Sequence, residues 1–381
     1  MRRLAVLGST GSIGRSTLDV VRRLAGRFEV VSLAARSRAD DLAAQIEEFA
    51  PKRAVLTDER FFGKLKERVG AGGVKLACGG DALAELAADP SVDVVVSGIV
   101  GAAGLMPALA ALRAGKLLAL ANKEPLVMAG EMMTKAAEES GALIIPVDSE
   151  HSAIFQALKS GRREEVARLI LTASGGPFRS LSAAEQARVT RREALAHPTW
   201  SMGPKITVDS ATMMNKALEI VEARWLFGVG FDRIAVMIHP QSIVHSIVQY
   251  VDGSMVAQMG VPDMRLPIQY ALTYPERVAG GIPAPDLAKI GTLSFEEPDM
   301  ERFPSIALGD EAGRAGGTAG AVLNGANEAA VEMFLAGRIG FRDIFERISG
   351  ALAKHKVKKA PSIEEIFEAD SWARATVAEG A

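Results

Sequence analysis

Two carboxylates one residue apart close an apolar stretch of the chain. Asp148 and Glu150 follow the run from Ile144 to Val147. If this run is a β-strand that continues to Glu150, both carboxylates point to the same face, because side chains alternate along a strand. Neighbouring carboxylates repel each other unless a cation or a proton lies between them. The pair therefore predicts a site that holds a cation or a shared proton.

A third carboxylate, Glu219, lies on a predicted helix over 211–225. Three carboxylates with no cysteine among them form a hard oxygen site, which favours Mg²⁺ or Mn²⁺ over Zn²⁺. The alternative for Glu219 is a solvated charge on the helix surface, the commonest role of a glutamate.

Two segments offer donors for a phosphate group. Ser174 precedes two glycines, a pattern that could present a hydroxyl and backbone N–H groups to a phosphate, or could form an ordinary turn. Farther along, Asp209 or Ser210 is expected to cap the predicted helix at its N-terminus, where an anion is favoured. Asn215 and Lys216 add an amide and a positive charge on that helix.

The residues between these two segments have the composition of a lid. A polar, arginine-rich stretch over 180–198 leads into a segment that contains Trp200, Met202 and Gly203. A glycine-flanked segment with one Trp and one Met near its end is typical of a loop that closes over a ligand. The alternative is a surface helix that anchors these two side chains in the core.

The first residues of the chain predict a dinucleotide site. A strand-like run over 4–7 is followed by a glycine-rich segment from Gly8 to Gly14 and by a helix over 16–24. Glycines at these positions permit a tight turn and let backbone N–H groups approach a pyrophosphate. The spacing is G-x-x-G-x-x-G, so an ordinary strand–helix turn is the alternative.

The end of the second predicted strand, over 29–34, indicates which dinucleotide binds. NAD-binding folds carry an acid there that holds the ribose 2′-hydroxyl. This chain has Ala35, Arg36, Ser37 and Arg38 instead. An arginine pair with a serine suits a 2′-phosphate, so NADPH is expected in preference to NADH. A solvated basic loop is the alternative.

Strand and helix patterns alternate through the first 150 residues. Further strands are expected over 53–56, 92–97 and 117–121, and helices over 40–49, 61–69, 81–87, 105–114 and 128–140. This alternation predicts an α/β fold with an N-terminal Rossmann-like parallel sheet. Ligands bind outside the carboxyl ends of such strands, so the cofactor, residues 122–124 and residues 148–150 should share one rim.

The remaining residues predict a central α+β catalytic domain and a helical C-terminal domain. The runs 234–238, 242–250 and 254–259 are expected to form a small antiparallel sheet, and helices are expected over 322–335, 341–354 and 363–377. The predicted organisation is an NADPH-binding domain over 1–148, a catalytic domain over 149–274 with a lid over 175–204, a linker over 275–298 and a helical domain over 299–381.

The composition excludes several classes of partner. The 381 residues are 48% hydrophobic and 24% charged with a formal net charge of −2, which gives no reason to expect nucleic acid or a membrane. No apolar run is long enough to cross a bilayer, and no signal peptide is expected. The single cysteine, Cys78, excludes an intrachain disulfide and suits a reducing compartment, so a cytoplasmic protein is expected.

Motifs along essentially the whole chain resemble the 1-deoxy-D-xylulose 5-phosphate reductoisomerase family. They are Gly8-Ser9-Thr10-Gly11-Ser12-Ile13-Gly14, Ala121-Asn122-Lys123-Glu124, Pro146-Val147-Asp148-Ser149-Glu150-His151, Ala173-Ser174-Gly175-Gly176-Pro177-Phe178, His197-Pro198-Thr199-Trp200-Ser201-Met202-Gly203, Asp209-Ser210-Ala211-Thr212-Met213-Met214-Asn215-Lys216, His239-Pro240-Gln241-Ser242-Ile243-Val244-His245-Ser246 and Asn324-Gly325-Ala326-Asn327-Glu328. The resemblance implies a homodimeric enzyme that rearranges 1-deoxy-D-xylulose 5-phosphate and reduces the product with NADPH to 2-C-methyl-D-erythritol 4-phosphate, in non-mevalonate isoprenoid biosynthesis.

The resemblance also implies roles for individual residues. The implied metal ligands are Asp148, Glu150 and Glu219, which with Lys123 and His197 form the implied catalytic group. The implied substrate contacts are Lys123, Ser149, Glu150, Ser174, His197, Ser210, Asn215, Lys216 and Glu219. The implied NADPH contacts are Thr10, Gly11, Ser12, Ile13, Asn122, Glu124 and Gly203, to which the basic loop at Ala35, Arg36 and Ser37 is added, and the implied lid residues are Trp200 and Met202.

Two other functions fit parts of the sequence. The segment Asn122-Lys123-Glu124-Pro125 also resembles the Glu-Lys-Pro segment of metal-independent NADP-dependent sugar oxidoreductases. A non-enzymatic NADPH-binding module is the second alternative, in which the polar residues after 150 lie on an ordinary surface. The three carboxylates distinguish the metal-dependent enzyme from both.

Overall fold

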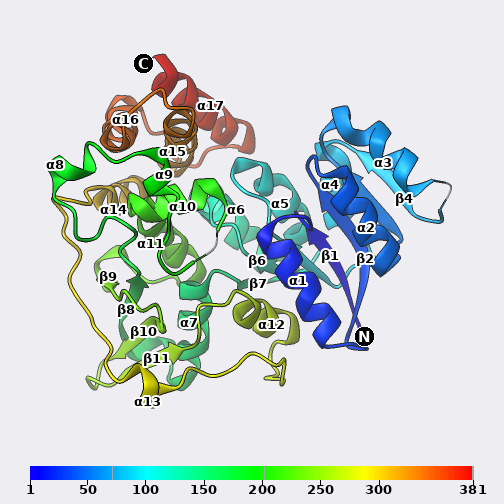
Figure 1. Ribbon diagram of the computed structural model, residues 1–381, viewed down its shortest axis with the longest axis horizontal. Helices are drawn as coiled ribbons and strands as arrows, with labels where there is room; N and C mark the ends of the chain where they lie inside the picture. Colours follow the sequence, from blue (N-terminus) through cyan, green and yellow to red (C-terminus); the bar gives the residue numbers. More distant parts are fainter. Residues whose placement is uncertain (71, 201, 380–381) are drawn as a thin grey trace. The chain divides into compact units, whose positions relative to one another are not determined.

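The computed structural model describes residues 1–70, 72–200 and 202–379. Its internal contacts divide the chain into two compact units. Unit 1 comprises Met1–Pro125, Glu131–Ser152 and Asp263–Pro283, and unit 2 comprises Leu126–Gly130, Ala153–Pro262 and Ala284–Ala381. Figure 1 traces the chain from its N-terminus in blue to its C-terminus in red.

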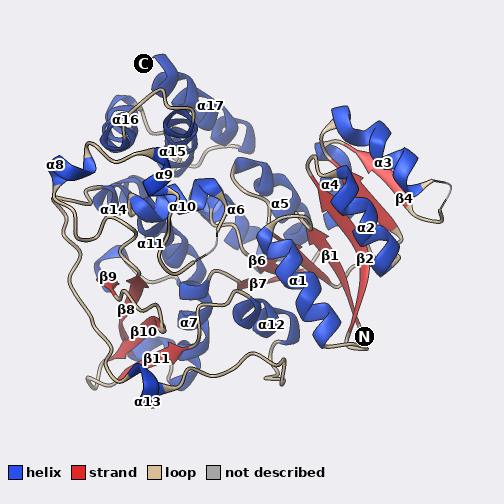
Figure 2. Cartoon of the chain, viewed as in Figure 1, coloured by secondary structure: helices blue, strands red, loops and turns tan. Residues whose placement is uncertain are grey.

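Unit 1 contains a seven-stranded parallel sheet of order β4-β3-β2-β1-β5-β6-β7. The strands are β1 (Arg2–Leu7), β2 (Phe28–Ala35), β3 (Arg53–Leu56), β4 (Lys75–Cys78), β5 (Val94–Ser97), β6 (Leu117–Leu120) and β7 (Leu143–Pro146). They are drawn in red in Figure 2. The strand order reverses between β1 and β5, which is the point where ligands bind in open parallel sheets. The predicted α/β fold is confirmed.

The helices that begin in or belong to unit 1 include those that connect these strands. They are α1 (Ser12–Arg23), α2 (Ala39–Phe49), α3 (Phe62–Val69), α4 (Gly80–Ala87), α5 (Leu105–Arg113), α6 (Glu124–Ser140), α7 (Ser149–Ala157) and α12 (Arg265–Thr273). Helix α12 packs against α1, where Arg265 Nη1 lies 2.9 Å from Asp19 Oδ2. The sheet interior is apolar, because strands covered on both faces must bury both sets of side chains.

Three expectations for unit 1 were wrong in detail. Strand β4 was not predicted, because its four residues carry only one large apolar side chain, Leu76. Helix α1 begins at Ser12, so the end of the glycine-rich segment is already helical. Strand β7 ends at Pro146, and the carbonyl of Asp148 accepts from Ser152 N as α7 begins. Strand alternation therefore does not orient Asp148 and Glu150.

Unit 2 contains a four-stranded mixed sheet. Its strands are β8 (Val166–Ala173), β9 (Ile234–Ile238), β10 (Val244–Tyr250) and β11 (Met255–Met259), in the order β11-β10-β8-β9. The predicted antiparallel sheet of three consecutive strands is wrong, because β8 lies between β9 and β10 and runs parallel to β9. The turn from His239 to Ile243 carries the chain past the end of β8, where His239 N donates to Ala173 O over 2.6 Å.

The other helices all lie in unit 2. They are α8 (Ala183–Gln186), α9 (Arg191–Ala194), α10 (Pro204–Ala211), α11 (Met214–Phe227), α13 (Leu287–Ile290), α14 (Ser305–Ala315), α15 (Ala319–Leu335), α16 (Phe341–Lys354) and α17 (Ile363–Glu379). The short 3₁₀ turns of the chain are Glu59–Phe61, Ala102–Gly104, Leu158–Ser160, Arg163–Glu165 and Phe231–Arg233. The expected helical C-terminal region is confirmed, and glycines let its helices pack closely. A Cβ on Gly309 of α14 would lie 2.1 Å from Ala217 O of α11.

The expected helix over 211–225 is wrong at its N-terminal end. Helix α10 ends at Ala211, Met213 has a left-handed φ of 59°, and α11 begins at Met214. Asp209 and Ser210 therefore lie in the last turn of α10 and do not cap α11. Unfavourable backbone geometry at a methionine has no local sequence signal, so the break was not predicted.

The three-domain division stays a prediction. Internal contacts group residues 275–283 of the predicted linker with unit 1 and residues 284–298 with unit 2. The part of this stretch in unit 2 contacts the sheet where Glu296 pairs with Ile238 at the edge of β9, and most of its residues are exposed. Among the described residues, no helix combines the length and the apolar character needed to cross a membrane.

Candidate active site

The glycine-rich turn after β1 is shaped for a close approach of backbone to backbone. Gly8 has a φ of +81°, and a Cβ there would lie 2.6 Å from Gly98 O. A Cβ on Gly14 would lie 2.4 Å from both Gly8 O and Ser9 Cα. Gly11 is the residue before α1, and no side chain caps the N-terminus of this helix. The first N–H groups of α1 can therefore receive a pyrophosphate.

The predicted cofactor residues of this turn differ in their exposure. Thr10 is buried, Gly11 and Ile13 are half-buried, and Ser12 is exposed at the start of α1. Gln45 of α2 donates from Nε2 to Ser9 O over 3.0 Å and supports the turn from behind. Gln45 was missed by sequence reasoning, because a glutamine on a helix carries no motif.

The predicted 2′-phosphate residues lie at the carboxyl end of β2. Ala35 is the buried last residue of that strand, Ser37 is half-buried, and Arg36 is exposed. Arg38 was not placed among the predicted contacts, but its Nη1 donates to Thr10 O over 3.0 Å. This bond fixes the basic loop beside the glycine-rich turn, so the two predicted parts of the cofactor site lie together.

Residues 122–124 follow β6 in the same sheet. Ser97, at the end of β5, donates from Oγ to Asn122 Oδ1 over 2.7 Å. A Cβ on Gly104 would lie 2.2 Å from Asn122 Nδ2, so glycine is required for this amide to fit. Glu124 is buried at the start of α6. Residues 122–124 and 148–150 follow neighbouring parallel strands and so lie at one rim of the sheet, as expected. That the cofactor shares this rim stays a prediction.

Lys123 and Asp148 form a buried ion pair at this rim. Lys123 Nζ lies 2.5 Å from Asp148 Oδ2. Burial by itself raises the pKa of Asp148, but the positive charges of Lys123 and His151 outweigh it and hold this pKa well below its usual range. Asp148 is therefore an ionised carboxylate in a buried site. A carboxylate must be ionised to bind a cation.

The next two residues, Ser149 and Glu150, lie in the first turn of α7. Ser149 Oγ lies 2.5 Å from Glu150 Oε2, and both residues are half-buried. At the end of β7, next to the imidazole of His151, unit 1 thus supplies the carboxylate and hydroxyl oxygens of Asp148, Ser149 and Glu150. This donor set suits a hard divalent cation such as Mg²⁺.

In unit 2, one imidazole nitrogen faces two serine hydroxyls. His197 Nε2 lies 3.1 Å from Ser174 Oγ and 3.1 Å from Ser210 Oγ. His197 Nδ1 accepts from the N–H groups of Thr199 and Trp200, at 3.1 and 2.9 Å. The proton of a neutral imidazole must then lie on Nε2, which donates to the hydroxyl oxygens. Each hydroxyl keeps its own proton for a further acceptor.

Gly176 allows the loop of Ser174 to lie against the end of α10. Its φ is +67°, and a Cβ there would lie 2.7 Å from Ser210 O. Gly176 N also donates to Ser174 Oγ over 3.2 Å. The structure therefore brings together Ser174 and Ser210, which are 36 positions apart, and their hydroxyls can donate to one phosphate group. The ordinary-turn alternative does not account for this convergence.

Burial lowers the pKa of His197 from its ordinary value of 6.5. The imidazole is therefore neutral at physiological pH, in agreement with the tautomer that the hydrogen bonds require. A neutral imidazole in this place can hydrogen-bond to the two hydroxyls but carries no positive charge.

Asn215, Lys216 and Glu219 all lie on α11. Glu219 is fully buried and accepts hydrogen bonds from the amide of Asn215 and the ammonium of Lys216. Lys216 Nζ also donates to Thr172 O over 2.7 Å. Glu219 is thus not a solvated surface charge, and that alternative is wrong.

The predicted lid, residues 175–204, contains the two short helices α8 and α9. Trp200 and Met202 are half-buried, and the ring of Trp200 lies 6.2 Å from the ring of His245. Gly203 is exposed and precedes α10, and residue 201 lies outside the described residues. The first part of the segment is anchored, since Phe178 packs edge-on against Phe341 with 5.0 Å between ring centroids. Lid movement stays a prediction.

Models of one protein family match three parts of the chain. They are described as 1-deoxy-D-xylulose 5-phosphate reductoisomerase over residues 4–130, as the C-terminal domain of that enzyme over 144–227, and as the DXP reductoisomerase C-terminal domain over 259–376. Together they cover most of the sequence, including both units.

Relatives carry the same name. The chain is 55% identical over 376 residues to 1-deoxy-D-xylulose 5-phosphate reductoisomerase of Chlorobium chlorochromatii, which covers 99% of this chain and 98% of the relative. It is 54% identical to the enzyme of Heliobacterium modesticaldum, with 98% and 96% covered.

Solved structures agree with the sequence comparison. The reductoisomerase of Zymomonas mobilis in complex with NADPH is 45% identical, with a TM-score of 0.93 over 99% of this chain and 98% of that one. A DOX-P reductoisomerase in complex with NADPH, fosmidomycin and magnesium is 41% identical, with a TM-score of 0.95 over 100% and 98%. This chain belongs to the 1-deoxy-D-xylulose 5-phosphate reductoisomerase family.

Proposed function

We propose that this protein converts 1-deoxy-D-xylulose 5-phosphate to 2-C-methyl-D-erythritol 4-phosphate with NADPH and a divalent metal ion. The observation that carries the proposal is the meeting of Ser174, His197 and Ser210 around one point in unit 2. This arrangement provides two hydroxyl donors for the phosphate of a sugar phosphate. A simple NADPH-binding module has no use for it.

Unit 1 fits NADPH. The glycine-rich turn leaves no room for a Cβ at Gly14, and the start of α1 is uncapped by side chains. Thr10, Gly11, Ser12 and Ile13 would contact the pyrophosphate, as turns of this kind do. The remaining proposed NADPH contacts are Ala35, Arg36, Ser37, Asn122, Glu124 and Gly203.

The proposed metal ligands are Asp148, Glu150 and Glu219. Their carboxylate oxygens suit Mg²⁺, and Mn²⁺ accepts the same ligand set. When bound, the metal would act as a Lewis acid on substrate oxygens, and NADPH would supply the hydride. Lys123, paired with Asp148, is proposed to move protons among those oxygens.

The remaining substrate contacts are proposed to bind and orient. Ser174, Ser210, Asn215 and Lys216 would hold the phosphate, and Ser149 and His197 would hold the sugar oxygens and the serine hydroxyls. The phosphate is remote from the reacting carbons, so its binding energy can drive closure of residues 175–204 over the site. Trp200 and Met202 would then help to exclude water.

NADPH oxidation tests the proposed function. Absorbance at the NADPH band is followed with 1-deoxy-D-xylulose 5-phosphate, with Mg²⁺ or Mn²⁺, and after chelation. The expected result is oxidation that requires the metal and is lost in Asp148→Asn. Oxidation without metal would favour the sugar oxidoreductase, and NADPH binding without turnover would favour the binding module.

A cytoplasmic homodimer is the proposed form of the protein. The single cysteine suits a reducing compartment. Strand β11 lies at the edge of the sheet in unit 2; its first residue, Met255, is 52% exposed, and Val251 in the preceding turn is 69% exposed. An edge strand with exposed apolar side chains is a natural place for a second copy to pair. Light scattering would give twice the chain mass, and a monomer mass at micromolar concentration would contradict the dimer.

A further inference from the structure

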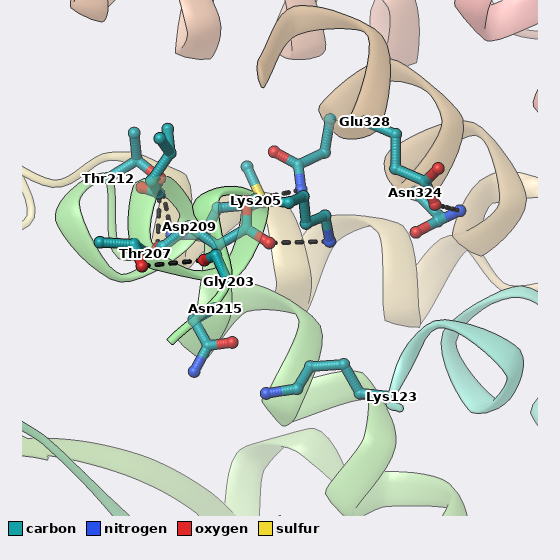
Figure 3. Close-up of polar contacts among 12 residues, drawn as sticks. Lys123, Gly203, Lys205, Thr207, Asp209, Thr212, Asn215, Asn324 and Glu328 are labelled. Carbon is teal, nitrogen blue, oxygen red and sulfur yellow. Dashed lines mark hydrogen bonds and ion pairs between the residues drawn. The ribbon is translucent and has the colours of Figure 1, made fainter. Parts of the chain in front are cut away.

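Helix α15 reaches the short helix α10 through a buried amide. Asn327 Nδ2 of α15 donates to Asp209 Oδ1 of α10 over 2.9 Å. The other carboxylate oxygen, Asp209 Oδ2, lies 2.7 Å from Lys205 Nζ, one turn earlier on α10. Asp209 is 1% exposed and Asn327 is fully buried. Figure 3 shows Asp209 and Lys205 joined on α10.

Asp209 immediately precedes Ser210, whose hydroxyl lies 3.1 Å from His197 Nε2. Successive side chains on a helix point about 100° apart. If Asp209 is held against α15, the rotation of α10 about its own axis is set, and Ser210 is aimed at His197. The amide of Asn327 thus acts on the position of Ser210 through the side chain of Asp209.

Helix α10 is held by apolar packing, since Val208 and Ala211 are fully buried, and by the directional contact at Asp209. It has eight residues, starts after the exposed Gly203 and ends before the left-handed Met213. Thr207 and Thr212 bond to carbonyls within the helix and its ends, as Figure 3 shows, so they stabilise the helix without orienting it. A buried carboxylate that must satisfy two donors on different helices is a directional contact, unlike apolar packing.

We propose that Asp209 is a positioning residue for substrate phosphate binding, and that Asn327 acts with it. The motif Asn324-Gly325-Ala326-Asn327-Glu328 thereby serves the reaction through Ser210 without touching the substrate. The inference rests on the proposed function, because it assumes that Ser210 binds phosphate.

Asp209→Asn is the sharpest test, because it keeps the shape of the side chain. A carboxylate accepts from both Lys205 and Asn327, whereas an amide has one acceptor and one NH₂ group. One of the two donors would then face another donor, and α10 would rotate or shift. A displacement of about 1 Å in a binding group can cost on the order of a hundredfold in rate. We expect kcat/KM for 1-deoxy-D-xylulose 5-phosphate to fall by roughly tenfold to a hundredfold.

The distinguishing measurement concerns phosphate. In Asp209→Asn, the KM for the sugar phosphate and the inhibition constant of inorganic phosphate should rise together, while the KM for NADPH stays within about twofold of its original value. In a Ser210→Ala background, Asp209→Asn should add less than about threefold, because the residue that it positions is gone. A general loss of structure would instead raise the KM for both the sugar phosphate and NADPH. Its effect would add in full to that of Ser210→Ala.

Asp370→Asn is the matched control. Asp370 is also a buried carboxylate bonded to α15, since Asn324 Nδ2 lies 3.3 Å from Asp370 Oδ1, but it lies on α17. This variant should leave the inhibition constant of phosphate unchanged. If Asp209→Asn does not fold, Asn327→Ala removes the same contact while keeping the ion pair with Lys205, and should raise the KM for the sugar phosphate less.

The outcomes separate the two proposals. If Ser210→Ala leaves the phosphate inhibition constant unchanged, the proposed phosphate site is wrong. If Ser210→Ala raises it but neither Asp209→Asn nor Asn327→Ala does, the phosphate site stands and the positioning role is overturned.

Discussion

Lys123 Nζ lies 2.5 Å from Asp148 Oδ2, and the two side chains are 5% and 10% exposed. They follow neighbouring parallel strands, β6 and β7, whose carboxyl ends lie side by side. The pair explains how a carboxylate can stay ionised in a buried place: the ammonium offsets the cost of burying its charge. It also places a proton donor beside a proposed metal ligand.

We expect Lys123→Ala to lower turnover by roughly a hundredfold or more, because a positioned proton donor contributes about 10²–10⁴-fold. The dissociation constant of NADPH, measured by fluorescence, should change by less than about threefold, since the glycine-rich turn is untouched. Lys116→Ala is the control, because Lys116 Nζ bonds only a carbonyl, that of Val92, among the contacts described for it. Unchanged turnover in Lys123→Ala would reject the proton-transfer role.

Local sequence predicted the parts of the site that follow directly from chain order. Asn122 and Asp148 come straight after apolar strands, and in a parallel sheet this alone places them at one rim. The break at Met213 was not predicted, so the expected helix cap at Asp209 or Ser210 was wrong. That failure has a physical reason: packing within unit 2, rather than local propensity, decides where α10 ends.

Pairs that are far apart in sequence could not be predicted at all. Asp209 and Asn327 are separated by 118 positions, and neither residue type indicates a partner. The same holds for the mixed sheet, because the strand between β9 and β10 comes from residues 166–173. Sequence periodicity predicts that strands exist, but the order of strands depends on tertiary contacts.

Gly14→Ala should weaken NADPH binding by at least roughly tenfold, since about 1.4 kcal/mol of distortion is enough for that factor. The new Cβ would lie 2.4 Å from Gly8 O and Ser9 Cα, so the turn must open. Gly63→Ala is the control, because a Cβ there meets nothing within 4 Å. Titration of both variants with NADPH gives the comparison, and equal affinities would show that the turn does not bind the cofactor.

Arg36→Ala should reduce the preference for NADPH over NADH. Arg36 is exposed after β2, where a guanidinium can pair with a 2′-phosphate that NADH lacks. The KM for NADPH should rise by about tenfold or more, which corresponds to one charge-assisted hydrogen bond, while the KM for NADH stays the same. Parallel increases for both cofactors would assign Arg36 a structural role instead.

Mg²⁺ should stabilise protein from which a chelator has removed the metal, because it binds the three proposed ligands. At a hundredfold excess over its dissociation constant, a ligand that binds only the folded state adds about 2.7 kcal/mol to the free energy of unfolding. Glu219→Gln should lose most of this gain, because the amide oxygen is a weaker ligand for a hard cation. Glu332→Gln, an exposed position on α15, should keep it. Thermal unfolding with and without Mg²⁺ measures both, and an equal gain in both variants would exclude Glu219 as a ligand.

Acidification should destabilise the protein through His197. Burial lowers its pKa below the ordinary value of 6.5, so the unfolded chain binds a proton more readily than the folded protein does. Above about pH 6.5 the titration of His197 therefore does not reduce the free energy of unfolding. This free energy declines as the pH falls from there through the lower pKa of the folded state. Burial lowers the pKa of His355 as well, so both residues contribute to the decline.

Urea unfolding at pH 8.5, 7.5 and 5.5 measures this dependence. In His197→Asn, the loss of free energy of unfolding between pH 7.5 and 5.5 should be smaller than in the original protein, and the share due to His355 should remain. Between pH 8.5 and 7.5 both imidazoles are neutral, so their contribution to the difference should vanish. An unchanged loss on acidification in His197→Asn would mean that His197 is as easily protonated in the folded protein as in the unfolded chain, and that the neutral imidazole between Ser174 and Ser210 is the wrong description of the site.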